Sequence, residues 1–176
     1  DNDGKRGEYS TGYMNEDYGI DFTPEVFVGR ISTNNPTNVS AIANRIVAYE
    51  QATEPWKEKN LLPAAFLNYQ GEPEPVYLQT DGALFMEFMR NTCLAEQENF
   101  TMYEQEGVVP SFPCDLPVNY DNLINKLNSE SWGFINWDAH GSSTNSSRKV
   151  WENDYNQNNI PEDNEMDWRS LVDRQS

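Results

Sequence analysis

The sequence has 176 residues, and its 29 acidic side chains outnumber its 12 basic ones to give a formal net charge of -17 at pH 7. This charge repels phosphate, so we expect no nucleic acid and no anionic membrane surface among the partners. No apolar stretch reaches the roughly 20 residues that a membrane-spanning helix needs. We expect a segment of a longer protein, because the chain begins without methionine and ends in polar sequence.

The first part of the chain combines a polar start with a short strand and a helix. Residues 1–23 are rich in Gly, Asp and Tyr without a sustained hydrophobic period, which predicts an N-terminal loop region. The apolar run at residues 25–31 predicts a short strand. Behind the turn at residues 34–37, which supplies a capping hydroxyl at Thr37, apolar side chains recur at helical spacing over residues 39–49 and predict a helix.

The middle of the chain alternates between strands and helices. Apolar runs at residues 61–69, 100–103 and 132–137 have the length of buried strands. The segments at 77–89 and 121–127 place apolar residues on one face of a helix. Such alternation requires crossover connections, so we predict an α/β fold with a mostly parallel sheet that helices cover on both faces.

Two segments carry turn or polar sequence instead. Three prolines between residues 107 and 117 predict a loop, because proline removes a backbone donor and fixes φ. Residues 152–165 contain almost no aliphatic side chain, so we expect a long exposed loop, followed by a helical turn near residues 168–172. The predicted organisation is a loop region at 1–23, a partial α/β domain at 24–151, and a polar loop with the start of the next element at 152–176.

The chain has one histidine, His140, which follows the last apolar run and directly precedes Gly141. In parallel α/β sheets ligands gather beyond the carboxyl ends of the strands. We therefore expect the His140 ring to face outward from the rim of the sheet. The glycine allows a substrate to approach the backbone closely, and its N–H is available to donate.

An ordered set of stretches resembles a known family. Residues 21–31 read DFTPEVFVGRI, the following helix ends in Tyr49 and Glu50, residues 120–128 read YDNLINKLN, and GFINW leads into the His140-Gly141 pair. The set is similar to the gingipain-like cysteine peptidases of the caspase–hemoglobinase clan over roughly residues 13–151. The resemblance implies a caspase-like sheet, incomplete in this chain, and a cysteine endopeptidase acting on peptide or protein substrates.

The resemblance also implies roles in catalysis. His140 would be the general base for a cysteine thiol, and the Gly141 amide would stabilise the oxyanion. Family members carry the nucleophile at the end of the strand after the histidine, among small residues. Neither Cys93 nor Cys114 has that context, so we expect the nucleophile C-terminal to residue 176, in the remainder of the same parent protein, and this segment alone to be inactive. We expect both thiols to be unpaired.

An acidic group could orient the histidine ring. Alternation along a strand would put Asp138 on the same face as His140, which makes Asp138 our first choice. Glu72 and Asp81 are the other candidates, and no spacing rule chooses among the three.

Other functions fit the sequence less well. Without the family likeness, a histidine at a strand end is more often a structural residue than a catalyst. Ser142 and Ser143 lack the Gly-x-Ser-x-Gly context of a serine hydrolase. One histidine and two scattered cysteines give no zinc-ligand spacing. The alternative function is a catalytically inactive peptidase-like module that serves as a binding or structural part of an exported surface assembly.

Calcium is the one metal we expect, in a structural role, and no cofactor is required for the chemistry. Oxygen-bearing side chains gather at residues 15–17 with Asp21 and Glu25, and again at residues 152–165. Neither stretch has an EF-hand pattern. Gingipain-like enzymes carry structural calcium, and the resemblance also implies a secreted or cell-surface protein.

Overall fold

The computed structural model describes residues 30–72 and 78–173 and divides the chain into two units, Asp1–Gln51 and Ala52–Ser176. The first unit contains helix α1 (Pro36–Gln51), which confirms the helix predicted behind the turn. Its cap is the Asn35 side chain, which accepts from the Thr37 amide at 2.9 Å, rather than the Thr37 hydroxyl. The strand predicted at 25–31 lies outside the described residues except for Arg30 and Ile31, which are not in a strand.

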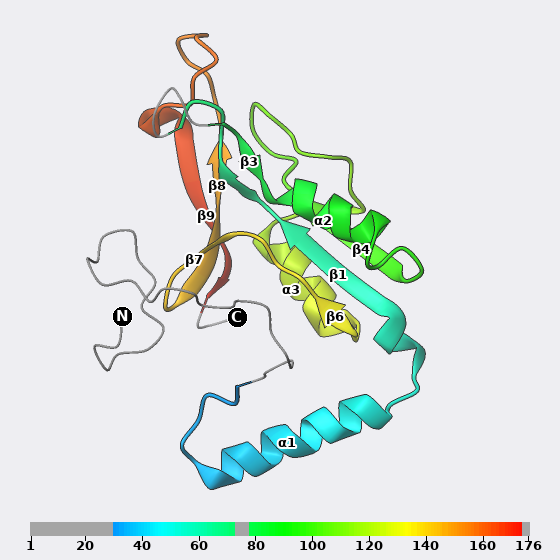
Figure 1. Cartoon of the computed structure of the whole chain (residues 1–176). Coiled ribbons are helices and arrows are strands. Elements are labelled where there is room, and N and C mark those ends of the chain that lie inside the picture. The colour runs from blue at the N-terminus through cyan, green and yellow to red at the C-terminus, as the bar shows by residue number, and fades with distance from the viewer. Residues whose placement is uncertain (1–29, 73–77, 174–176) are drawn as a thin grey trace, which may run out of the picture. The chain divides into compact units, whose positions relative to one another are not determined.

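The second unit contains a four-stranded parallel sheet (Figure 1). Its strands are β1 (Lys59–Ala64), β4 (Glu98–Tyr103), β5 (Leu116–Pro117) and β6 (Phe134–Ile135), in the order β5-β4-β1-β6. All three neighbouring pairs are parallel. The predicted α/β class with a mostly parallel sheet is confirmed, although β5 occupies the end of the segment predicted as a loop.

The apolar run predicted as one strand at 61–69 is divided in two. Five consecutive residues of β1 are buried, as expected for a strand covered on both faces. The chain then leaves the sheet at Ala65 and forms β2 (Phe66–Asn68), which pairs antiparallel with β3 (Thr80–Asp81). Continuous hydrophobicity does not reveal where a strand changes partner, so no local pattern marks the break.

Helices cover both faces of the parallel sheet, as predicted. Leu62 of β1 packs with Met86 of α2 (Gly82–Asn91), whereas Leu61 packs with Leu123 of α3 (Tyr120–Ser129). Neighbouring residues of a strand point to opposite faces, so α2 and α3 lie on opposite sides. Helix α2 begins at residue 82 rather than 77, because the Asp81 side chain caps it by accepting from the Ala83 amide at 2.9 Å.

A three-stranded antiparallel sheet has the order β7-β8-β9 (Figure 1). Its strands are β7 (His140–Gly141), β8 (Asn145–Trp151) and β9 (Met166–Asp173), with a 3₁₀ turn at Asp163–Glu165. The helical turn predicted at 168–172 is wrong, and β8 was not predicted. Pairing along seven residues of β8, from Asn145 to Trp151, holds β9 extended and buries Leu171 against the core on the α3 side.

A buried ion pair connects the parallel sheet with the β7-β8-β9 sheet. Arg148 of β8 donates to Glu104, just beyond β4, at 2.6 Å and to Glu106 at 2.8 Å. The Glu104 side chain is 0% exposed. Burial raises the pKa of Glu104 although Arg148 acts to lower it. Burial also acts to raise the pKa of the more exposed Glu106, but Arg148 and Arg169 outweigh it and lower that pKa.

Replacing Arg148 with methionine leaves the Glu104 carboxylate buried without a cation, so we expect the free energy of unfolding to fall by about 3–5 kcal/mol. Urea denaturation measures the change.

The control is Arg90→Met, which removes a partly exposed pair with Glu87 at 3.1 Å and is expected to change stability by less than about 1 kcal/mol. A double variant, Glu104→Met with Arg148→Met, should recover much of the loss. Equal effects of the two arginine substitutions would contradict this account.

Candidate functional site

The backbone after β6 runs beside β1 up to its carboxyl end. The Asn136 amide donates to the Leu61 carbonyl at 3.1 Å and the Asp138 amide to the Pro63 carbonyl at 3.0 Å. The Asp138 carbonyl in turn accepts from the Ala65 amide at 2.9 Å. His140 therefore emerges directly past the end of β1, at the edge of a parallel sheet where ligands usually bind.

The surroundings of the His140 ring differ from those we predicted. Instead of facing outward from a parallel strand, His140 lies in β7, antiparallel to β8 and opposite Ser147. Its ring packs edge-on against Trp168 of β9, with centroids 4.8 Å apart and planes at 74°. Its Nε2 is buried without a hydrogen-bond partner among the described residues. The sequence did not predict the contact with Trp168, because residues 168–172 were expected to be helical.

Gly141 presents its backbone to an open side of the antiparallel sheet. The Ser142 amide donates to the Asn145 carbonyl at 2.9 Å, so the next pair, Gly141 and Ser146, is a non-hydrogen-bonded one. The Gly141 N–H therefore points away from β8, along the outer edge of β7. A side chain built at this residue would meet nothing within 4 Å. The outward N–H and the open space around Gly141 both agree with the prediction that a substrate can approach this backbone donor.

Asp138 lies against the N-terminus of α2. A Cβ built on Gly82 would come within 2.9 Å of the Asp138 side chain. Burial raises the pKa of Asp138, and the charge of Asp81 raises it further, while His140 acts to lower it. Asp138 is therefore held close to a second carboxylate and within electrostatic reach of the histidine.

The other two acidic candidates have partners. Asp81 caps α2 and accepts from the Ser111 hydroxyl at 2.6 Å. Glu72 pairs with Lys149 and accepts from the Tyr69 amide. No hydrogen bond joins His140 to any of the three carboxylates in the part of the chain that is described. The structure thus brings Asp138 and Asp81 near one another, but no contact shows which carboxylate orients the His140 ring.

Neither cysteine belongs to this arrangement. Helix α2 starts at the carboxyl end of β1 and has ten residues, so Cys93 behind it lies about 15 Å further along, toward the opposite end of the sheet. Cys114 precedes β5, which three strand spacings, about 14 Å, separate from β6. Burial raises the pKa of the Cys114 thiol, which disfavours the thiolate. Both thiols are free, as expected.

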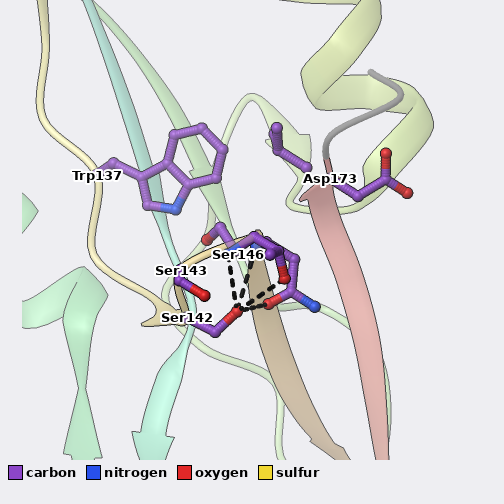
Figure 2. A pocket seen from close by; sticks show the side chains of 8 residues that line it. Trp137, Ser142, Ser143, Ser146 and Asp173 are labelled. Atoms are coloured by element: carbon purple, nitrogen blue, oxygen red, sulfur yellow. Dashed lines mark hydrogen bonds between the residues drawn. The ribbon is translucent and has the colours of Figure 1, made fainter.

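The turn after Gly141 borders a cavity of about 460 Å³. Figure 2 shows its lining residues, which include Trp137, Ser142, Ser143, Ser146 and Asp173. The Ser142 hydroxyl donates to the Asn145 side chain at 2.7 Å and accepts from the Asn145 amide at 3.3 Å. Ser142 therefore builds the turn, which agrees with our rejection of a serine nucleophile.

Sequence reasoning missed the two tryptophans of the site. Trp168 contacts the histidine ring, and Trp137, whose buried Nε1 has no partner among the described residues, lines the cavity. The alternating pattern of residues 166–173 could have indicated a strand that carries Trp168. No local pattern pairs that strand with the histidine.

A parallel α/β sheet with a histidine-glycine pair just past its carboxyl end defines the class of caspase-like peptidase folds. The chain matches the model of peptidase family C25 over residues 4–168. The chain belongs to peptidase family C25, the gingipain-like cysteine peptidases, so the resemblance inferred from the sequence is confirmed. No curated protein and no solved structure is found to match it.

Family membership implies a protein substrate. Among the residues that the structure describes, no helix is both long enough and apolar enough to cross a bilayer.

The raised pKa of Asp138 gives a test of the site by stability. A carboxyl with a raised folded-state pKa prefers its protonated form there, so ionisation reduces stability as the pH rises through and beyond the ordinary aspartate pKa. We expect Asp138→Asn to melt at a higher temperature than the unmodified chain at pH 7, and the difference to vanish below the ordinary aspartate range. Thermal melts across pH measure it. The control is Glu96→Gln, at an exposed residue, whose melting temperature should show no such dependence on pH. A lower melting temperature of Asp138→Asn than of the unmodified chain at pH 7 would contradict a raised pKa at Asp138.

Proposed function

We propose that this chain is the histidine-bearing part of a cysteine endopeptidase, with His140 as general base and a cysteine nucleophile C-terminal to residue 176. The observation that carries the proposal is the place of the His140-Gly141 pair, directly past the carboxyl end of β1 in a C25 family fold. Neither cysteine of the chain lies there, so a thiol must come from elsewhere in the parent protein.

The outer edge of β6 supports the presence of a further strand in the parent protein. Among the strands that the structure describes, β6 is at the edge of the sheet, and its Phe134 and Ile135 are 41% and 42% exposed. Strands of parallel sheets are normally covered on both faces and bordered by neighbours. A further parallel strand at this edge would pair with the β6 backbone, would flank both side chains, and would end on the same side of the sheet as His140. A cysteine at its end would then face the histidine.

In the proposed reaction, His140 and Gly141 assist a cysteine thiol in hydrolysing a peptide bond. His140 accepts the thiol proton, which raises the thiolate concentration at neutral pH, and the thiolate attacks the carbonyl carbon of the scissile bond. The protonated imidazole then donates that proton to the leaving amine, and water hydrolyses the acyl-enzyme. The outward Gly141 N–H donates to the oxyanion as negative charge develops on the carbonyl oxygen.

We assign the orienting role to Asp138. Its side chain is the acidic candidate without a hydrogen-bond partner among the described residues, whereas Asp81 caps a helix and Glu72 pairs with Lys149. A negative charge near the imidazole stabilises the imidazolium that forms in both proton transfers.

The alternative is a peptidase-like module without catalysis. The packing of His140 against Trp168 favours it, because an edge-on aromatic contact is also what a structural histidine makes. The sequence of the parent protein beyond residue 176 distinguishes the two functions. An apolar strand ending in a cysteine among small residues supports the enzyme, and its absence supports the module. For either function we propose a secreted or cell-surface location, which the gingipain-like family supports.

His140→Ala tests the base assignment in the full-length parent protein. We expect kcat/KM for peptide hydrolysis to fall by about 10²–10⁴, because a positioned base contributes rate enhancement of that order. The circular dichroism spectrum should stay unchanged, which separates lost chemistry from lost folding. Unchanged turnover would end the assignment.

Cys93→Ser and Cys114→Ser test the position of the nucleophile. Because both thiols lie away from His140, we expect each variant of the parent to retain peptide hydrolysis within about twofold, where loss of a nucleophile costs orders of magnitude. Labelling by an iodoacetamide probe provides a second readout, since an activated thiolate reacts fastest. Loss of both labelling and turnover in either variant would show that the nucleophile lies within this chain.

A further inference from the structure

The loop between β8 and β9 has the ligand spacing of an EF-hand calcium loop. Counted from Asp154, oxygen-bearing side chains occupy the first, third, fifth, ninth and twelfth positions, and Ile160 occupies the seventh, where the pattern uses a backbone carbonyl. The side chains are Asp154, Asn156, Asn158, Glu162 and Glu165. This spacing is a more specific indication of a calcium site than an abundance of acidic residues, because each oxygen occupies a ligand position of the EF-hand loop.

The sixth position explains why the sequence alone did not reveal the pattern. The EF-hand pattern requires glycine there for a sharp turn, and this chain has Asn159. Asn159 adopts a φ of 58°, the left-handed conformation that glycine would supply. Asparagine is among the few other residues that tolerate it. The backbone therefore makes the required turn without the glycine, so the full pattern is absent from the sequence while its turn is present in the fold.

Side chains of the loop point toward one another. Asp154 accepts from the amides of Asn158 and Asn159 at 3.1 and 3.0 Å. The side-chain amides of Asn156 and Asn158 reach the Glu162 carboxylate at 3.1 and 3.2 Å. Hydrogen bonds within the loop thus already connect the first, third, fifth and ninth positions.

Glu165 supplies an independent observation. Its side chain is buried, with the residue 2% exposed, and accepts from the Tyr155 amide at 2.7 Å and from Trp151 Nε1 at 3.3 Å. No lysine or arginine pairs with it in the described part of the chain. A buried carboxylate with neutral donors only is costly, because its charge has lost water without gaining a counter-charge. Such a group points to a cation as its missing partner.

We propose that residues 154–165 bind a calcium ion through Asp154, Asn156, Asn158, the Ile160 carbonyl, Glu162 and Glu165. Six or more oxygen ligands suit calcium rather than magnesium, which demands a tight octahedral shell. No three acidic, histidine or cysteine side chains are gathered as a cluster among the described residues. The site therefore depends on two amide oxygens and a carbonyl as well as its carboxylates.

The bound ion has a structural role. The loop joins β8 to β9, and β9 carries Trp168, against which His140 packs. Calcium holds the two strand ends together by connecting Asp154, just after β8, with Glu165, just before β9. It thereby stabilises the hairpin without touching the histidine.

The test compares Glu165→Gln with Asp163→Asn in the full chain. Both variants remove one negative charge from the same loop, but Asp163 is at the tenth position, which is not a ligand position. Asn156→Ala, at an exposed ligand position, covers the case in which Glu165→Gln does not fold. Calcium is titrated from chelator-treated protein, with melting temperature and terbium luminescence as readouts. Trp151 and Tyr155 are close enough to Glu165 to excite a terbium ion bound there.

We expect saturating calcium to raise the melting temperature of the unmodified chain and of Asp163→Asn by about 5–10 °C. Affinity should fall at least about tenfold in Glu165→Gln and Asn156→Ala. Magnesium at the same concentration should have little effect. The proposal is overturned by the absence of a calcium response, or by equal responses in all variants, which would place any bound calcium outside this loop.

Discussion

The ion pair between Arg148 and Glu104 determines how the parallel sheet and the β7-β8-β9 sheet lie against each other. Both side chains are withdrawn from water, so the pair is favourable only in a narrow range of distances and angles. This requirement fixes β8 relative to the end of β4. Tyr69 adds a second connection, since its hydroxyl donates to the Lys149 carbonyl at 3.1 Å and accepts from the Trp151 amide at 3.2 Å. Strand β8 is therefore anchored from the loop after β4 and from the segment after β2.

The position of His140 depends on this anchoring. The parallel sheet brings the chain to the carboxyl end of β1, as it does in other α/β folds, but it does not orient the imidazole. The orientation comes from β7, which pairs with β8, and from Trp168 on β9. The proposed calcium loop connects β8 with β9 at the far end of the same hairpin. The parallel strands thus set the location of His140, and the antiparallel strands set the orientation of its ring.

Membership of peptidase family C25 gives this geometry a chemical meaning. The proposed function draws on three features of the described residues: a His140 Nε2 without a partner, an outward backbone N–H at Gly141, and exposed apolar side chains on β6. Burial and the charge of Asp81 raise the pKa of Asp138, whereas His140 acts to lower it. Perturbed pKa values of this kind are common at functional sites.

Local periodicity and short ordered motifs were enough to predict the α/β class, helices α1, α2 and α3, the strands at the centre of the sheet and the family. They did not reveal the break after β1, the strands β8 and β9, or the contact between His140 and Trp168. Those features depend on pairing between segments distant in sequence, which outweighs local preference. The turn at Asn159 belongs with them, since only the folded backbone shows an asparagine in the conformation of a glycine.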